Sequence, residues 1–312
     1  MNQLQSIDES LLQRVRDLEA FIGKTPLFPL HQFSPNPNVK IYAKLEWMQL
    51  GGSVKARPAY NIIRQAIESG ELWPGRRLLD ATSGNTGIAY ASICSALNIP
   101  LTIIMPENAS KERKMILSSL GAELIYTSRF DATDGSQAKA LELSNAEPLK
   151  YYYADQYANE ANWKAHYETT SHEIINQTKG EITHFIAGLG TTGTFVGTSR
   201  GLKVMNPTIQ CISLQPETAL HGLEGWKHLE TAKVPKIYDE TVADQNWEVS
   251  TTDGYEMIKR VAANGGLLLS PSAGANLAGA IKLAGQIDAG HIVTIFADNA
   301  EKYSDVLNHL FP

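Results

Sequence analysis

The feature that most constrains the fold is an alternation between short apolar runs and longer segments with helical spacing. The runs 39–47, 76–82 and 101–106 read as strands, and the segments that follow the first two, 53–69 and 85–97, read as helices. Further strands are expected at 122–127, 182–190, 209–216 and 291–298, and further helices at 110–121, 136–145, from about 193, and at 253–263. Such alternation predicts an α/β fold with mainly parallel sheets flanked by helices.

At 312 residues the chain exceeds the usual size of one compact domain, so two lobes are expected. Composition marks no boundary between them. The stretch 217–250 is rich in polar residues and has no clear periodicity. We interpret it as a long functional loop over a site.

Charge and hydropathy argue against several classes of protein. The formal net charge is −6, whereas a nucleic-acid-binding protein would present a basic patch. Basic residues are dispersed and no apolar run could span a bilayer, so we expect no membrane association. The N-terminal segment lacks the apolar stretch of a signal peptide, and Leu11, Leu12, Val15 and Leu18 predict a surface helix there.

The two cysteines, Cys94 and Cys211, both lie in apolar surroundings. This pattern favours buried free thiols over a disulfide framework or a metal site. We therefore expect a soluble, cytoplasmic protein without a bound metal.

The segment GLGTTGTFVG at 188–197 closes a predicted strand and opens a predicted helix. Small residues at such a turn let backbone N–H groups approach an anion, and the helix dipole and threonine hydroxyls assist. A phosphate cradle and a simple tight turn are both compatible with this stretch. A dinucleotide site is disfavoured, because the pattern is not GxGxxG and no acidic residue ends the next strand.

The segment DATSGNTGIAYA at 80–91 is a second strand end that runs into a helix. It gathers hydroxyls, an amide and backbone donors at one helix N-terminus, which suits a carboxylate. The alternative is ordinary capping, since Ser, Thr and Asn favour caps. More polar positions are present than a cap requires.

Lys55 lies in GGSVKAR, where Ser53 is expected to cap a helix that carries Lys55 in its first turn. The helix dipole there disfavours an ammonium, and a neutral amine is what a Schiff-base lysine needs. The alternative is that Lys55 is one more solvated surface charge.

Taken together and in this order, these segments resemble pyridoxal-phosphate enzymes of the cysteine synthase family, which have the tryptophan synthase β-like fold (fold type II). KLEWMQLGGSVKAR resembles the block that carries the family's Schiff-base lysine, and TSGNTG matches its substrate loop. GLGTTGT and SPSAGA resemble its phosphate loop and its C-terminal serine segment. The likeness runs from GKTPL at 23–27 to DNAEKY at 298–303, and it is strongest for the cysteine synthase B or O-phosphoserine sulfhydrylase branch.

The resemblance implies roles for individual residues. Lys55 would form the internal aldimine with pyridoxal 5'-phosphate and then act as acid and base. Asn85 would bind the cofactor's ring hydroxyl, and Ser272 would face its pyridine nitrogen. The cofactor phosphate would be held by Gly190, Thr191, Thr192, Gly193 and Thr194. The substrate carboxylate would be bound by Thr82, Ser83, Gly84, Thr86 and Gln156.

The implied activity is replacement of the β-substituent of O-acetylserine or O-phosphoserine by a sulfur nucleophile, which makes L-cysteine through an aminoacrylate. A neutral hydroxyl at the pyridine nitrogen makes the ring a moderate electron sink, suited to rapid loss of a β-leaving group. Lys227 lies about where a basic residue of the branch meets a substrate phosphate, although it could also be an exposed loop residue. The sulfur donor could be sulfide, thiosulfate or a thiocarboxylated carrier protein.

Several alternatives remain open. Relatives with similar motifs make 2,3-diaminopropionate-type amino acids, and others are serine/threonine dehydratases. A catalytically weak, cofactor-binding sensor or partner protein is also considered, because Ala56 replaces the family's Asp after the lysine and DNAEKY replaces D-R-G-D-R-Y. Gln49 and Leu50 replace the family's Asn-Pro.

The resemblance also implies a homodimer of two-lobed subunits. The smaller, substrate-loop lobe is expected at 43–152, and the larger, cofactor-phosphate lobe at 1–42 together with 153–312. The cofactor is expected at strand ends between these lobes.

Overall fold

The computed structural model describes residues 8–312, and the chain divides into two compact units. The first unit comprises residues up to 22, together with 49–51 and 55–162. The second comprises 23–48, 52–54 and 163–312. Each unit contains a mainly parallel sheet with helices packed against it, which confirms the predicted α/β class.

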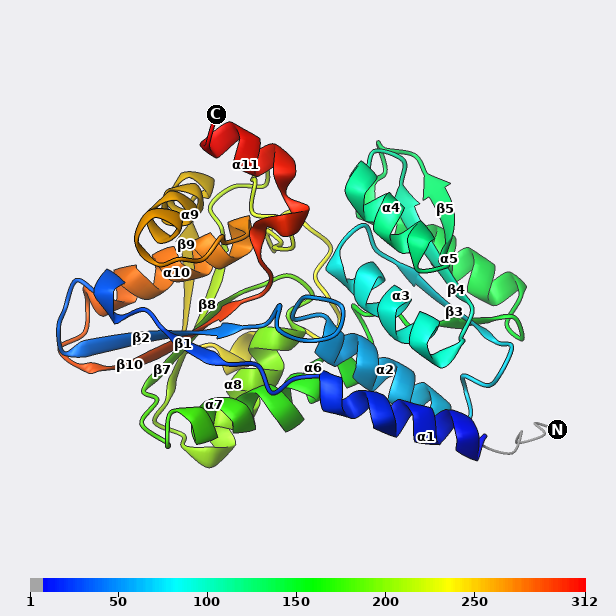
Figure 1. Ribbon diagram of the computed structural model, residues 1–312, viewed down its shortest axis with the longest axis horizontal. Coiled ribbons are helices and arrows are strands. Elements are labelled where there is room, and N and C mark those ends of the chain that lie inside the picture. Colours follow the sequence, from blue (N-terminus) through cyan, green and yellow to red (C-terminus); the bar gives the residue numbers. More distant parts are fainter. Residues whose placement is uncertain (1–7) are drawn as a thin grey trace. The chain divides into compact units, whose positions relative to one another are not determined.

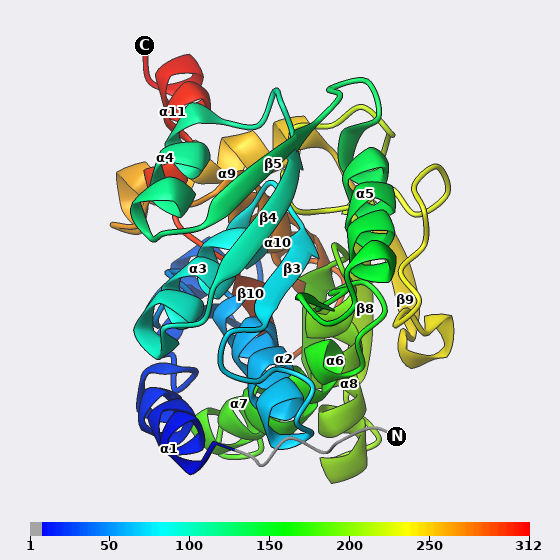
Figure 2. The same ribbon diagram turned by 90° about the vertical axis from the view of Figure 1, so that its right-hand side faces the viewer.

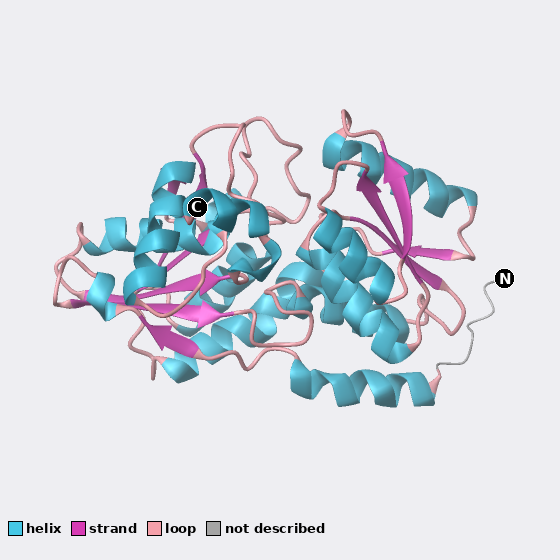
Figure 3. Ribbon diagram, turned by 45° about the horizontal axis from the view of Figure 1, so that its top comes forward, coloured by secondary structure: helices cyan, strands magenta, loops and turns pink. Residues whose placement is uncertain are grey.

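The sheet of the first unit is fully parallel. Its strands are β3 (Arg77–Ala81), β4 (Leu101–Pro106), β5 (Glu123–Thr127) and β6 (Tyr151–Tyr153). They lie in the order β5-β4-β3-β6. The helices are α1 (Glu9–Leu18), the 3-10 turn η1 (Glu19–Phe21), α2 (Ala56–Glu68), α3 (Asn85–Leu97), α4 (Lys111–Ser119) and α5 (Ala132–Ala146). Figure 2 shows α3 and α4 on one face of this sheet and α5 on the other, and in Figure 3 the strands lie between these helices.

Alternate residues of β3 and β4 enter two different cores. Leu78 and Ile103 pack in a cluster with side chains of α2 and α3, whereas Leu79 and Ile104 pack with Ala140 of α5. Successive strand side chains point to opposite faces, so both faces of this sheet need apolar residues. This requirement explains why apolar residues occupy successive positions of these strands, as at Leu78 and Leu79 of β3 and at Ile103 and Ile104 of β4.

The first sheet reverses its strand order between β3 and β6. From β3 the chain adds β4 and β5 on one side and then returns to place β6 on the other. Loops that leave two such strands at their carboxyl ends diverge, and ligands of α/β proteins bind at this point. The segments 82–86 and 154–159 begin there.

The second unit has a larger sheet with one antiparallel edge. Its strands are β1 (Leu27–Pro29), β2 (Val39–Leu45), β7 (His184–Gly188), β8 (Gln210–Pro216), β9 (Gln245–Val249) and β10 (Gly290–Phe296). Their order is β1-β2-β10-β7-β8-β9, and only the β1–β2 pair is antiparallel among the described strands. The order reverses between β7 and β10, so the segments 188–194 and 297–299 leave this sheet at its own switch point.

Helices cover both faces of the second sheet. The longer ones are α7 (Ser171–Gln177), α8 (Gly193–Met205), α9 (Thr251–Asn264), α10 (Pro271–Ala284) and α11 (Ser304–Leu310). Short turns are η2 (His31–Phe33), the π-helical η3 (His166–Thr170), η4 (Glu240–Val242) and η5 (Ala300–Lys302), and α6 (Ala161–Ala165) contains the boundary between the units. Figure 1 shows α9 and α10 on one side of the sheet and α7 and α8 on the other. Ile186 and Ile292 pack towards the first pair, and Phe185 and Val293 towards the second.

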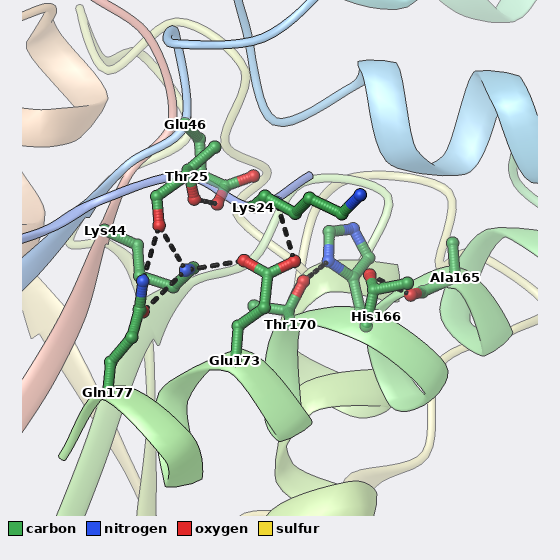
Figure 4. A network of polar contacts seen from close by, with 10 residues as sticks. Lys24, Thr25, Lys44, Glu46, Ala165, His166, Thr170, Glu173 and Gln177 are labelled. Atoms are coloured by element: carbon green, nitrogen blue, oxygen red, sulfur yellow. Dashed lines mark hydrogen bonds and ion pairs between the residues drawn. The ribbon is translucent and has the colours of Figure 1, made fainter. Parts of the chain in front are cut away.

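A buried polar cluster joins β2 to α7 in the second unit (Figure 4). The ammonium of Lys44 is fully buried, donates to Thr25 O and Gln177 Oε1 at 2.9 Å each, and pairs with Glu173 at 2.7 Å. The Thr25 hydroxyl donates in turn to the buried Glu46 carboxylate at 2.6 Å. A buried cation is tolerated only when its donors are satisfied in this way, so the cluster fixes the strand that leads towards Lys55.

The unit boundaries differ from the predicted lobes 43–152 and 1–42 plus 153–312. Helix α1 lies in the first unit because Leu11, Leu12 and Val15 share a core with α2 and α3. Residues 1–7 of the predicted larger lobe lie outside the described residues. The stretch 217–250 is not a loop throughout, since it also contains η4 and β9.

Both cysteines are buried free thiols, as predicted. Burial raises the pKa of Cys94 and raises the pKa of Cys211 to about 11. Thiols of this kind are inert at neutral pH. Within residues 8–312, no helix is both long and apolar enough to cross a membrane.

Candidate active site

The loop after β3 forms an uncapped helix start. Thr82, Ser83 and Gly84 leave the strand, and Asn85 and Thr86 open α3. Gly84 occupies the N-cap position and no side chain caps the helix, so ordinary capping does not account for this cluster of polar residues. Uncapped N–H groups at a helix start are suited to an anion.

Gln156 connects the two ends of this loop. Its side chain is 2% exposed, accepts from the Thr86 hydroxyl at 2.6 Å and donates to Ala81 O at 3.3 Å. The main-chain carbonyl of Gln156 accepts from Asn162 Nδ2 at 2.6 Å. The structure thus brings Thr86 and Gln156 together. It also shows that Gln156 organises the loop.

Lys55 is the half-buried N-cap residue of α2, which begins at Ala56. The sequence places Ser53 at the N-cap, but Lys55 itself occupies that position, and its side chain makes no capping hydrogen bond. Lys55 therefore lies directly at the positive end of the helix dipole, the environment expected for an amine that must give up its proton. Ala56 and Arg57, the next two residues, are fully buried.

The chain before Lys55 is held by the segment that follows β10. Val54 N–H donates to Ala297 O at 2.8 Å, and Lys302 Nζ donates to Gly52 O at 3.1 Å. Gly51 and Gly52 both have positive φ angles (81° and 61°), which explains the glycine pair at this turn. Lys302 belongs to DNAEKY, so one departure from the family pattern supports the segment that carries Lys55.

The loop 188–194 is shaped by steric limits on its glycines. A Cβ at Gly190 would lie 2.1 Å from Gly225 O, and a Cβ at Gly188 would lie 1.8 Å from an atom of the Trp226 ring. Lys227 N–H donates to Leu189 O at 2.7 Å. Residues 225–227 therefore pack against the turn, which agrees with the interpretation of part of 217–250 as a loop over a site.

The same loop leaves polar groups available to a phosphate. Thr192 has a left-handed backbone (φ 71°) and is 2% exposed, and its hydroxyl makes no hydrogen bond to any described residue. Helix α8 begins at Gly193 without a side-chain cap, with Thr194 in its first turn. Buried hydroxyls almost always have a partner, so this orphan hydroxyl beside a helix N-terminus fits an anionic group of the size of phosphate.

Ser272 lies in the first turn of α10, where it is 4% exposed. Ser270 caps this helix, and the two serine hydroxyls are 3.3 Å apart. Asn276, one turn further on, accepts from Gly188 N–H at 2.9 Å and donates to Ile295 O at 2.6 Å. These bonds fix α10 to β7 and β10, so the start of α10 has a defined position at the switch point of the second sheet.

Sequence reasoning missed His166. It is fully buried in the π-helical turn η3 (Figure 4), and its Nε2 is 3.2 Å from the Thr194 hydroxyl while Nδ1 is 2.9 Å from the Thr170 hydroxyl. It thus positions one threonine of the phosphate loop from outside that loop. Nothing in its local sequence, ANWKAHY, indicates this role, because only the fold brings His166 to Thr194.

These features define a cofactor-dependent α/β enzyme. Residues 18–298 match the family model of pyridoxal-phosphate dependent enzymes, so the chain belongs to that family. The orphan hydroxyl of Thr192 and the uncapped start of α8 fit a phosphate group such as the one this cofactor carries.

Individual relatives narrow the class. The chain is 44% identical over 303 residues to the cysteine synthase of Aquifex aeolicus, which covers 95% of this chain and 93% of the relative. It is 35% identical over 288 residues to cysteine synthase B of Escherichia coli, with 92% and 93% covered. The crystal structure of an O-acetylserine sulfhydrylase isoform from Entamoeba histolytica is similar with a TM-score of 0.85 at 32% identity, covering 99% of this chain and 98% of that one.

Proposed function

We propose that the protein is a pyridoxal-phosphate-dependent cysteine synthase that replaces the activated β-oxygen of an L-serine derivative with sulfur and releases L-cysteine. The relatives above carry cysteine synthase and O-acetylserine sulfhydrylase names, which supports O-acetylserine as the first candidate substrate. The observation that carries the proposal is the pair of uncapped helix starts at α3 and α8, each in a loop that matches a motif of the family.

Different residues of the chain have different proposed roles towards the cofactor and the substrate. Lys55 would hold the cofactor through its amine, and Nζ, once displaced by the substrate's amine, would move a proton at the substrate's α-carbon. The cofactor, when bound, withdraws electrons so that the β-substituent can leave. Ser272 offers the ring nitrogen a neutral hydroxyl, Asn85 binds the ring hydroxyl, and the residues of 190–194 hold the phosphate.

The substrate carboxylate is proposed to bind at Thr82, Ser83, Gly84, Thr86 and Gln156. The helix dipole of α3 and its uncapped N–H groups attract the negative charge. The Thr86 hydroxyl donates its proton to Gln156 Oε1 at 2.6 Å, so this bond is exchanged when the hydroxyl donates to a substrate carboxylate. The backbone donors of a helix start are fixed in direction and lose little entropy on binding, which favours a well-defined orientation.

The proposed role of Lys55 is tested with the variant Lys55→Ala. We expect loss of the absorption band of the covalently bound cofactor and loss of L-cysteine formation. Lys40, a surface-strand lysine, provides the control Lys40→Ala, which should keep both. Full activity of Lys55→Ala with the band retained would overturn the assignment.

The identity of the leaving group and that of the sulfur donor are determined by assays with different substrates. Each of the two substrates, O-acetylserine and O-phosphoserine, is assayed with each candidate sulfur donor: sulfide, thiosulfate and a thiocarboxylated carrier protein. Lys227 is proposed to bind the phosphate of O-phosphoserine, and Lys227→Ala should then raise KM for that substrate alone. Equal KM values in the variant and the wild type for both substrates would remove Lys227 from the site.

The assay of L-cysteine formation also distinguishes the proposed reaction from that of a serine/threonine dehydratase. A serine/threonine dehydratase would release pyruvate or another 2-oxo acid without a sulfur donor, whereas a cysteine synthase requires one for turnover. A cofactor-binding sensor would form no cysteine with any activated serine.

We also propose that the protein works as a cytoplasmic homodimer. Its large exposed apolar side chains include Phe130, Leu149 and Leu220, which a subunit contact could cover. Light scattering of the purified protein tests this proposal. A mass of about 34 kDa, the mass of one chain, would contradict it.

A further inference from the structure

Asp80 is the next-to-last residue of β3, just before the substrate loop, and it carries a buried carboxyl group. Its side chain is fully buried, and Oδ1 accepts from the Ala81 N–H at 2.8 Å. Oδ2 has no hydrogen-bond partner in ordinary geometry, and no cation pairs with Asp80 within residues 8–312. A buried carboxylate without a basic partner is costly, so the site favours the uncharged acid.

Tyr90 faces Asp80 from the other end of the loop. It is fully buried on α3, and its hydroxyl also lacks a partner in ordinary hydrogen-bond geometry. Burial raises the pKa of both groups, and the nearby Asp80 carboxyl raises the pKa of Tyr90 further, while the Tyr90 hydroxyl lowers the pKa of Asp80 to a smaller extent. The pair therefore spans the loop, with Asp80 on the strand before it and Tyr90 on the helix after it.

The same carboxyl also acts on Gln156. Ala81 links the two residues, because its N–H donates to Asp80 Oδ1 and its carbonyl accepts from Gln156 Nε2, while Gln156 Oε1 accepts from the Thr86 hydroxyl. Asp80 and Gln156 thus connect β3, α3 and the segment after β6 at the switch point of the first sheet.

Titratable groups near Asp80 come from three elements. Helix α3 contributes Tyr90, with Cys94 beside it, and strand β6 contributes Tyr152 and Tyr153. The segment after β6 contributes Asp155 and Tyr157, while the neighbour in register on β4 is the apolar Ile103. Asp134 of α5 acts on Tyr157. Burial is the main cause that raises the pKa of Asp80 to about 7, and the nearby Asp155 adds to it.

We propose that Asp80 is a positioning residue for the amino-acid substrate: the Asp80 carboxyl holds Ala81, the end of β3 that Gln156 connects to Thr86 across the loop 82–86. This inference rests on the proposed role of that loop in binding the substrate carboxylate. The uncharged acid leaves the electrostatic potential at the α3 N-terminus positive. Ionised Asp80 places a negative charge behind the loop and repels the substrate carboxylate.

L-alanine is the probe, because it has the α-carboxylate of the substrate and no β-leaving group. Its Kd for the holoenzyme is measured by calorimetry between pH 6 and 8.5. For the wild type we expect Kd to rise about tenfold through neutral pH as Asp80 ionises. For Asp80→Asn, which keeps an oxygen for the Ala81 N–H and cannot ionise, we expect a rise at least fivefold smaller.

Tyr90→Phe provides a second variant with a different signature. Removal of the hydroxyl that lowers the pKa of Asp80 should move the rise in Kd to higher pH, while its size is kept. A purely structural role for either residue would change stability and leave the pH profile of Kd unmoved. This variant also carries the test if Asp80→Asn does not fold.

Ser83→Ala separates this inference from the proposed function. If Ser83→Ala binds L-alanine as tightly as the wild type, the loop is not the carboxylate site and both proposals fail. If Ser83→Ala binds weakly but Asp80→Asn and Tyr90→Phe keep the wild-type pH profile, only the role of Asp80 is overturned.

Discussion

The substrate loop of the first unit (82–86) and the phosphate loop of the second unit (188–194) both open a helix, but different kinds of contact hold them in place. Both leave the carboxyl end of a parallel strand at a switch point and open a helix that no side chain caps. The phosphate loop is set by close backbone packing around Gly188 and Gly190 and by the left-handed Thr192. The substrate loop is set by polar side chains, chiefly Gln156 and Asp80.

The difference matches what each loop is proposed to hold. A phosphate that stays bound through every cycle is best served by a rigid cradle, whose shape steric contacts fix. A substrate carboxylate enters and leaves in each cycle, and polar side chains can hold the loop without filling it. Glycine substitutions should therefore damage the two loops unequally.

The largest effect is expected for Gly190→Ala. Its Cβ would lie 2.1 Å from Gly225 O, so the backbone of one of the two segments must shift. We expect cofactor affinity to fall by at least about a hundredfold, since several donors to the phosphate are displaced together. Gly84→Ala is the matched control, because a Cβ there meets nothing within 4 Å. Cofactor titration measures the affinity of both variants. Equal cofactor affinities for Gly190→Ala and Gly84→Ala would contradict the proposed difference between the two loops.

The next effect concerns Asp80 and the pH dependence of stability. Its pKa is raised from 3.8 to about 7 in the folded protein, so its contribution to stability is complete below about pH 4 and is lost as pH rises to about 7. The loss corresponds to about 4 kcal/mol at most. Asp80→Asn should remove this fall, which urea unfolding at pH 5 and pH 8 measures. A parallel fall in the variant would show that other groups cause it.

A moderate effect is expected for Thr192→Val, which removes the orphan hydroxyl of the phosphate loop and keeps the side-chain shape. Hydrogen bonds to charged groups contribute about 1.5–3 kcal/mol, so cofactor affinity should fall about tenfold or more. Stability of the cofactor-free protein should not fall, because the hydroxyl bonds no described residue. A loss of stability with unchanged cofactor affinity would contradict the proposed role.

The smallest effect is expected for Thr86→Val in the substrate loop. The variant loses the 2.6 Å hydrogen bond to Gln156, and KM for the amino-acid substrate should rise about tenfold while cofactor affinity is kept. Thr86→Ser retains the hydroxyl and should behave nearly as the wild type. Reduced cofactor affinity in Thr86→Val would show that the two loops are not separable as described.

Much of the fold could be read from the sequence because its strands are buried on both faces. Runs such as LTIIMP and HIVTIF place apolar residues towards two helical layers, and these runs occur where β4 and β10 lie. The unit boundaries were less predictable. Helix α1 joins the first unit through Leu11, Leu12 and Val15, and a local pattern does not say which core an apolar helix face will meet.

The sequence by itself determined the α/β class, the position of the two helix starts that we propose to bind anions and, through its motifs, the family. Those properties depend on residues close together in the chain, because the helix dipole and uncapped N–H groups are local. Only the tertiary structure decided what supports each loop. His166 reaches Thr194, Lys302 reaches Gly52, and Gln156 connects Ala81 with Thr86 across long sequence separations. Contacts of this kind arise from strand order and helix packing, and no short segment specifies them.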